Sequence, residues 1–87
     1  MKVIEIEQKI FELEEVRVII RSPASVDFPS GYDYQKKADK SASITEWLAT
    51  RVRPIVGDCE VVVIDGSGTI PHGRTKMATL RDSYIRD

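Results

Sequence analysis

The alternation of apolar and polar residues predicts strands in two parts of the chain. Apolar residues alternate with arginines over residues 16–21, where only Ile19 breaks the pattern, so this segment fits a half-buried strand. Residues 60–64, EVVVI, hold four apolar residues in a row. Such a run is typical of a central strand that is covered on both faces. We therefore expect the strand at residues 60–64 to lie inside a sheet.

The first fifteen residues fit two structures. Residues 3–7 alternate aliphatic and acidic side chains, which favours a strand. Ile6, Ile10 and Leu13 also keep helical spacing, and the residues between them are good helix formers, so a helix over residues 5–14 competes. We favour a strand at residues 3–7 paired with the one at 16–21, because β-branched residues dominate both ends of the segment.

A helix is predicted from Ile44 to Arg53. Ser43 and Glu46 have the spacing of a capping box, in which each side chain accepts a hydrogen bond from a free backbone N–H at the helix start. One face of this helix is apolar and includes Trp47, which we place in the core. Pro54 is expected to end the helix.

The C-terminal segment leaves two alternatives open. Met77, Leu80 and Tyr84 have helical spacing, whereas a poorer alternation over the same residues fits a strand. The sequence as a whole predicts a single α+β domain over residues 1–87. We expect an antiparallel sheet of three to four strands with one amphipathic helix packed across it, in the order β-β-α-β-β or β-β-α-β-α.

Composition narrows the class of protein. The 87 residues are 41% hydrophobic and 31% charged, as in globular domains, so the chain is not expected to be disordered. The single cysteine, Cys59, excludes an internal disulfide and a zinc site built from several cysteines. No apolar run is long enough to span a membrane, and the first residues do not resemble a signal peptide. We expect a cytoplasmic protein without a metal or cofactor.

Charge is distributed unevenly along the chain. The net charge is −1, but residues 1–15 carry two cations and five acids, whereas residues 70–87 carry four cations and two acids. Either the two ends pack together, or the basic segment contacts the phosphates of a nucleic acid. Tyr32 and Tyr34, which precede three lysines, are expected at the half-buried rim of the core.

The loop after the apolar strand has the spacing of a phosphate-binding loop. Gly68 is followed five residues later by Gly73, Arg74 and Thr75. Nucleotide hydrolysis is disfavoured, because arginine stands where lysine is needed and only twelve residues follow Thr75. Pro71 also lacks the N–H that such a loop would use. A looser role in binding a phosphate or carboxylate stays open.

His72, the only histidine, has a catalytic and a structural interpretation. It could act as a general base with Asp65 or Ser67, or it could be an ordinary surface-loop histidine. No second histidine and no nearby cysteine accompany it, so a metal site is not expected.

Three classes of function follow. We favour a small non-enzymatic binding or adaptor protein that acts through protein–protein contacts or self-association. The alternative is a nucleic-acid-binding accessory protein that uses its basic C-terminal segment, and an enzyme at residues 65–74 comes third. The candidate ligand- or nucleic-acid-binding residues are Gly68, His72, Gly73, Arg74, Thr75, Lys76, Arg81 and Arg86.

Overall fold

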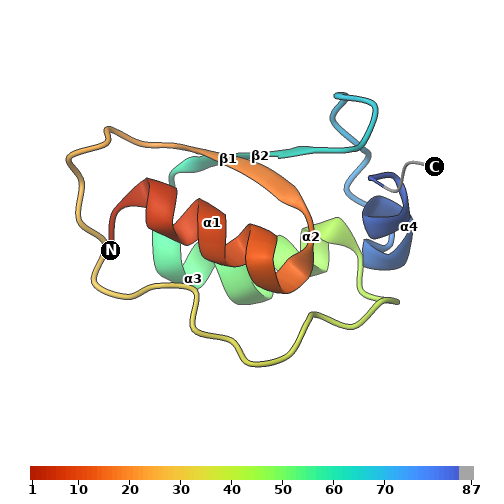
Figure 1. The fold of residues 1–87 in the computed structure, drawn as a ribbon, viewed down its shortest axis with the longest axis horizontal. Coiled ribbons are helices and arrows are strands. Elements are labelled where there is room, and N and C mark those ends of the chain that lie inside the picture. Colours follow the sequence, from red (N-terminus) through yellow and green to blue (C-terminus); the bar gives the residue numbers. More distant parts are fainter. Residues whose placement is uncertain (85–87) are drawn as a thin grey trace.

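The structure is a computed structural model, and it describes residues 1–84. Arg86, one of the predicted binding residues, lies outside the described residues. The described elements, in chain order, are α1 (Val3–Glu14), β1 (Arg17–Arg21), α2 (Ile44–Trp47), the π-helical segment η1 (Leu48–Val52), α3 (Arg53–Val56), β2 (Glu60–Ile64) and α4 (Met77–Asp82) (Figure 1).

The N-terminal segment is the helix α1, so the strand predicted at residues 3–7 is wrong. Ile6, Ile10 and Glu14 repeat every four residues and are fully buried, which is the spacing of one helix face. The Lys2 N–H donates to Glu5 Oε1 at 2.9 Å and satisfies a free donor at the helix start. Burial of one helical face outweighs the strand preference of the β-branched residues.

The strands predicted at residues 16–21 and 60–64 are confirmed as β1 and β2. They pair antiparallel, with Ile19 opposite Val62 at the centre. The described residues form a sheet of these two strands, in place of the three to four predicted. β2 is therefore an edge strand, and its apolar run does not mark the middle of a sheet.

The predicted helix start at Ser43 is confirmed. The Glu46 N–H donates to Ser43 Oγ at 3.1 Å, and the Ser43 N–H donates to Glu46 Oε1 at 3.2 Å. Pro54 does not end the helix, however, because the turn widens to a π-helix before it and α3 continues to Val56. The wider turn accommodates a residue that lacks an N–H and whose ring would clash in a regular α-helix.

The C-terminal segment adopts the helical alternative, α4. Met77 and Leu80 are its buried residues. The Met77 N–H donates to the Ala42 carbonyl at 2.8 Å, and the Ala78 N–H donates to the Lys40 carbonyl at 3.0 Å. These bonds attach the start of α4 to the segment that precedes α2.

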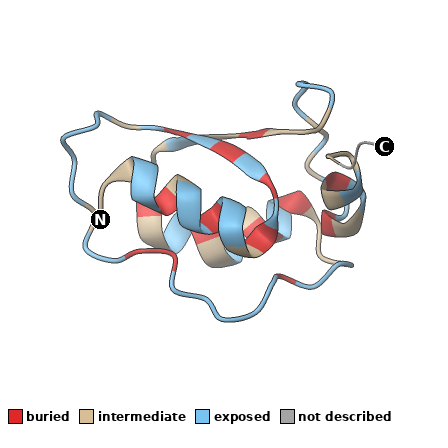
Figure 2. Ribbon diagram, in the orientation of Figure 1, coloured by how far each residue is buried: buried red, intermediate tan, exposed pale blue. Residues whose placement is uncertain are grey.

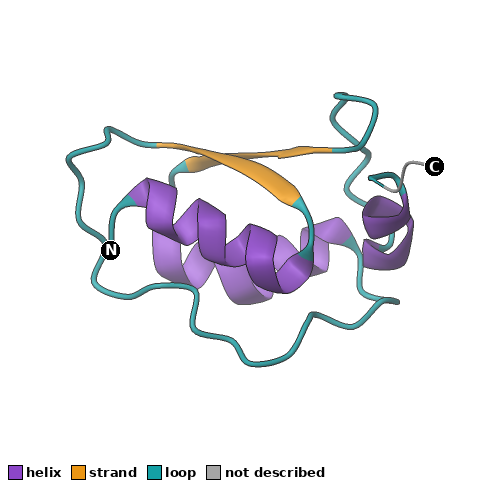
Figure 3. Cartoon of the chain, viewed as in Figure 1, coloured by secondary structure: helices purple, strands orange, loops and turns teal. Residues whose placement is uncertain are grey.

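The sheet lies across one side of α1 and the α2–η1–α3 helix, and α4 packs at one end (Figures 1 and 3). The core fills the space between these layers, where buried positions recur along each element (Figure 2). Trp47 is in this core, as predicted. Tyr32 is only 3% exposed, so its predicted place at the rim is wrong. No helix among residues 1–84 has the length and apolarity needed to cross a bilayer.

Candidate protein-binding site

The glycine-rich loop after β2 is organised around the carboxylate of Asp65. The Ser67 and Thr69 N–H groups donate to Asp65 Oδ1 at 2.9 and 3.0 Å. The Gly68 N–H donates to the Asp65 carbonyl at 3.0 Å. Hydrogen bonds from Thr69 hold the pKa of Asp65 below its usual range. A phosphate-binding loop aims its N–H groups at a bound anion, whereas the Ser67 and Thr69 N–H groups already bind the Asp65 carboxylate and the Gly68 N–H binds its carbonyl.

His72 is an exposed loop residue with one ring nitrogen engaged. Its Nδ1 atom accepts the Arg74 N–H at 3.0 Å, so this nitrogen is not available as a general base. Asp65, its candidate partner, uses both carboxylate oxygens within its own loop. In the described part of the chain, no group of three metal-ligating side chains occurs.

Residues 73–76 run beside the start of α2. The Thr45 N–H donates to the Gly73 carbonyl at 3.0 Å, and the Ile44 N–H donates to the Thr75 carbonyl at 2.9 Å. A Cβ atom at Gly73 would lie 2.3 Å from Thr45 Oγ1, so a larger residue here would require the Thr45 side chain to move. The arrangement places the exposed residues Arg74 and Lys76 together at the helix start.

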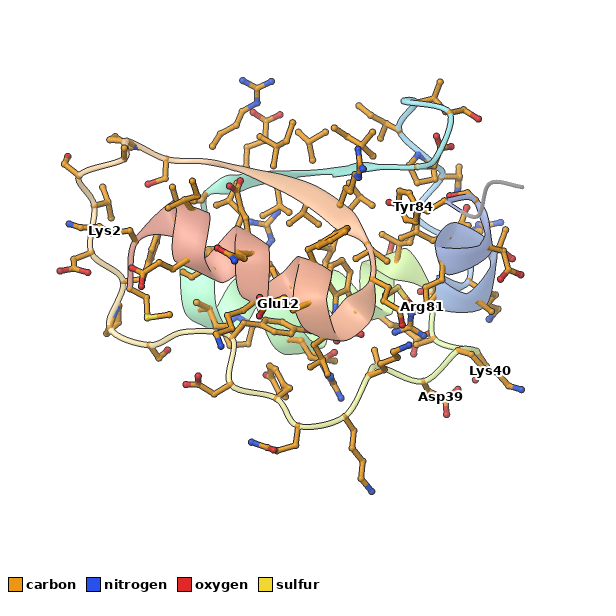
Figure 4. All side chains as sticks on the ribbon, in the orientation of Figure 1. Lys2, Glu12, Asp39, Lys40, Arg81 and Tyr84 are labelled. Carbon is orange, nitrogen blue, oxygen red and sulfur yellow. The ribbon has the colours of Figure 1, made fainter. Side chains whose placement is uncertain are left out.

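Arg81 lies apart from these two cations, in a buried network around Glu14. Its Nη2 atom is 2.7 Å from Glu14 Oε1, and Arg51 Nη1 is 2.9 Å from Glu14 Oε2. The Ala38 N–H and the Tyr32 hydroxyl also donate to this carboxylate. Figure 4 shows Arg81 at the end of α1. The prediction that the acidic and basic ends of the chain pack together is confirmed at Glu14 and Arg81.

This network is not among the features predicted from the sequence. Glu14 follows Ile6 and Ile10 at the same four-residue spacing. In a helix, this spacing indicates that Glu14 lies on the buried face. The Trp47 Nε1–H donates to the Tyr32 hydroxyl at 2.8 Å and links the network to α2. The contacts of Arg51 had no comparable signal, because they depend on how the loop before α2 folds back.

Along the outer edge of β2, backbone hydrogen-bonding groups have no partner among residues 1–84. The Ile20 N–H donates to Glu7 Oε2 at 2.8 Å, so it points away from β2. Val61 is opposite Ile20, and Val63 is opposite Val18 two residues along. Opposite residues of an antiparallel pair alternate between hydrogen-bonded and non-hydrogen-bonded pairs. The residues of a non-hydrogen-bonded pair turn their N–H and C=O groups outward on both strands. Val61 and Val63 therefore present these groups at the edge of β2 that faces away from β1.

A hollow of about 270 Å³ lies along this edge. Its lining comes from β2 residues 60–63, from Ile44 and Leu48 of the helix, and from Ile70 and Pro71 of the loop. Ile70 is 71% exposed, although its side chain is fully apolar. Gly73 also lines this hollow, which we call the β2 groove.

The outer edge of β1 is different because a charged side chain covers it. Glu7 accepts the Ile20 N–H there, and Gln8 and Arg17 line the adjoining hollow. This second hollow also exposes Ile4 and Phe11 on α1. Charged residues beside an edge discourage the addition of another strand.

Comparisons with protein-family models, with curated proteins and with solved structures each give no match.

Proposed function

We propose that this protein is a non-enzymatic binding module that holds a protein partner at the outer edge of β2. The observation that supports the proposal is the unpaired edge itself. It belongs to a strand with four consecutive apolar residues, and it borders an apolar hollow. Added strands bind through main-chain hydrogen bonds, while neighbouring hollows take alternate side chains.

The composition of β2 strengthens this proposal. Proteins usually block an exposed edge with lysine, proline, a bulge or a covering segment. Val61, Val62 and Val63 supply none of these, and β2 pairs with β1 without a break in register. An unprotected edge of this kind is a liability unless a partner covers it.

The other two classes of function draw less support from the geometry. A nucleic-acid site would use Arg81, but that guanidinium is committed to Glu14 and its side chain is 15% exposed. Arg74 and Lys76 remain as exposed cations. A catalytic site would use His72, whose Nδ1 atom is engaged by Arg74. We therefore place the binding activity at the edge of β2.

The test is selection of a phage-displayed library of random linear peptides on the immobilised protein. We expect an enriched pool whose binding is lost in Val61→Pro, since proline removes an outward N–H that takes no part in the pairing with β1. The matched control is Val61→Thr, which keeps the N–H and the β-branched shape. This control should bind the pool as the natural sequence does.

A second variant separates loss of binding from loss of fold. Ile70→Asp changes an exposed loop residue of the β2 groove and should leave the unfolding free energy within about 0.5 kcal/mol of the starting value. We expect it to weaken binding of the pool. If the pool binds Val61→Pro and Ile70→Asp as well as the unchanged protein, the site is not at β2 and the proposal fails.

A further inference from the structure

We infer that the occupant of the β2 groove is a single extended peptide segment, apolar along its length and acidic at the end beside Arg74 and Lys76. It would add to β2 as a third strand of the sheet. The inference rests on the proposed function and specifies the class of partner. Three features support it, namely the width of the groove, the layer of helices beneath it and the charges at its end.

The width of the groove fits one strand. Neighbouring strands lie about 4.8 Å apart, whereas packed helices lie about 8–10 Å apart. A sheet of two strands is therefore narrower than the two helical segments that it covers. Ile44 and Leu48 line the hollow together with Val61 and Val63, so we infer that the helix forms its floor beside the edge of β2. The remaining space above the helix accommodates one added strand.

The same helix excludes a second copy of this chain that pairs through its own β2. Two copies joined edge to edge, antiparallel, would keep their helices on the same face of the joint sheet. Each copy has an α2–η1–α3 helix beneath and beyond β2, so the two helices would occupy the same space. A partner segment without a helix under its edge has no such conflict. The free end or linker of another protein meets this requirement.

The charges at one end of the groove specify the flanking residue of the peptide. Gly73 lines the hollow, and Arg74 and Lys76 follow it on the surface. Among residues 1–84, neither cation takes part in an ion pair. Glu46, at the same helix start, uses its carboxylate to accept the Ser43 N–H. An acidic residue of the partner therefore complements two unpaired cations.

At the other end of the groove, the charged side chains are already engaged within the protein. Glu60 lies 3.3 Å from Arg21 across the strand pair, measured from Oε1 to Nε. The Arg53 guanidinium keeps its charge, but the carbonyls of Gly57 and Cys59 hold it in place. We therefore expect a weaker preference for acidic residues at that end. The acidic flank thus distinguishes one end of the bound peptide from the other.

The test compares peptide pools selected on two forms of the full chain. On the unchanged protein, we expect enriched sequences with a run of valine, isoleucine or threonine flanked by aspartate or glutamate. On the double variant Arg74→Glu, Lys76→Glu, the flank should change to lysine or arginine. An acidic-flanked peptide from the first pool should bind the double variant roughly tenfold more weakly, because two surface ion pairs are replaced by repulsions.

The matched control reverses two cations away from the groove, Lys9→Glu and Lys36→Glu, and changes the net charge equally. It should bind the acidic-flanked peptide as the unchanged protein does. If the pools on both charge forms lack an acidic preference yet depend on the Val61 N–H, this inference is wrong and the proposed function stands. If enrichment does not depend on that N–H, the proposed function fails too.

Sedimentation velocity on the protein alone tests whether a second copy of the chain binds at the edge of β2. We expect a monomer at every concentration studied. A dimer that dissociates in Val61→Pro and persists in Val61→Thr would overturn the inference, because it would show a second copy at the edge of β2.

Discussion

The polar groups of the Glu14 network are hydrogen-bonded inside the protein, whereas those at the outer edge of β2 face outward. Glu14 is fully buried, and its two carboxylate oxygens accept bonds from two guanidinium groups, a hydroxyl and a backbone N–H. No buried side-chain nitrogen or oxygen in the described part of the chain lacks a partner. Along β2, by contrast, the backbone groups of Val61 and Val63 face outward beside an apolar hollow.

The difference separates what holds the fold from what is free to bind. The network joins the end of α1 to α2–η1–α3, to α4 and to the loop before α2, so it locks four segments that are distant in sequence. The β2 groove uses groups that folding left unpaired. Substitutions in the network should therefore lower stability, while a substitution of the exposed groove residue Ile70 should lower binding and leave stability almost unchanged.

The largest effect is expected from Glu14→Gln. The amide keeps the volume of the side chain but removes the charge that Arg51 and Arg81 both need. Leaving buried charges without their counter-ion costs about 3–5 kcal/mol. Urea unfolding, followed by circular dichroism, measures the loss.

The matched control for this variant is Glu12→Gln, on the same helix. Glu12 is exposed and makes only weak surface contacts, 4.0 Å to Lys9 Nζ and 3.5 Å to Gln8 Nε2, so its replacement should change the unfolding free energy by less than about 0.5 kcal/mol. Equal costs for the two variants would show that Glu14 is not a buried counter-ion.

The features that could be predicted from sequence depend on neighbours along the chain. The cap at Ser43 and the two strands follow from side chains a few residues apart, and the structure has them in place. The strand predicted at residues 3–7 rests on the β-branched residues at both ends of the segment 3–21, whereas Ile6 and Ile10 have the helical spacing that α1 adopts. The choice between the two-residue repeat of a strand and the 3.6-residue repeat of a helix depends on which side chains the core buries.

The features that could not be predicted depend on contacts between distant segments. Arg74 and Arg81 are equally basic in the sequence, yet one is exposed and the other is bound to Glu14, 67 residues away. The apolar run of β2 predicted a central strand, because nothing local shows that only β1 pairs with it. Of the predicted site, Gly73 lines the β2 groove and Arg74 follows it on the surface, whereas Arg81 is held by Glu14.

A smaller effect is expected from Ser43→Ala, which sits between the two regions. The Ser43 hydroxyl caps the helix that supplies Ile44 and Leu48 to the groove. Its loss should cost about 1 kcal/mol of unfolding free energy. The control is Ser43→Asp, which retains an acceptor for the Glu46 N–H and should keep nearly full stability. If alanine and aspartate behave alike, the cap does not contribute to stability.

The smallest effect is a decline in stability at alkaline pH. It tests whether the Tyr32 hydroxyl is hydrogen-bonded within the Glu14 network. Burial, and then the hydrogen bond to Glu14, raises the pKa of Tyr32 above its ordinary value. An unfolded tyrosine loses its proton near pH 10. The contribution of the Tyr32 hydroxyl to stability is therefore fully present below about pH 10. It is lost as the pH rises towards the pKa of Tyr32 in the folded protein.

Urea unfolding at several pH values between about 8 and 11 tests this expectation. Tyr32→Phe should flatten the decline, because the group that resists ionisation in the folded state is gone. Tyr84→Phe serves as the comparison: burial also raises the pKa of Tyr84, so this variant should remove a separate part of the decline. If Tyr32→Phe shows the full alkaline slope, the Tyr32 hydroxyl is not held by Glu14, and the network is less closed than its geometry indicates.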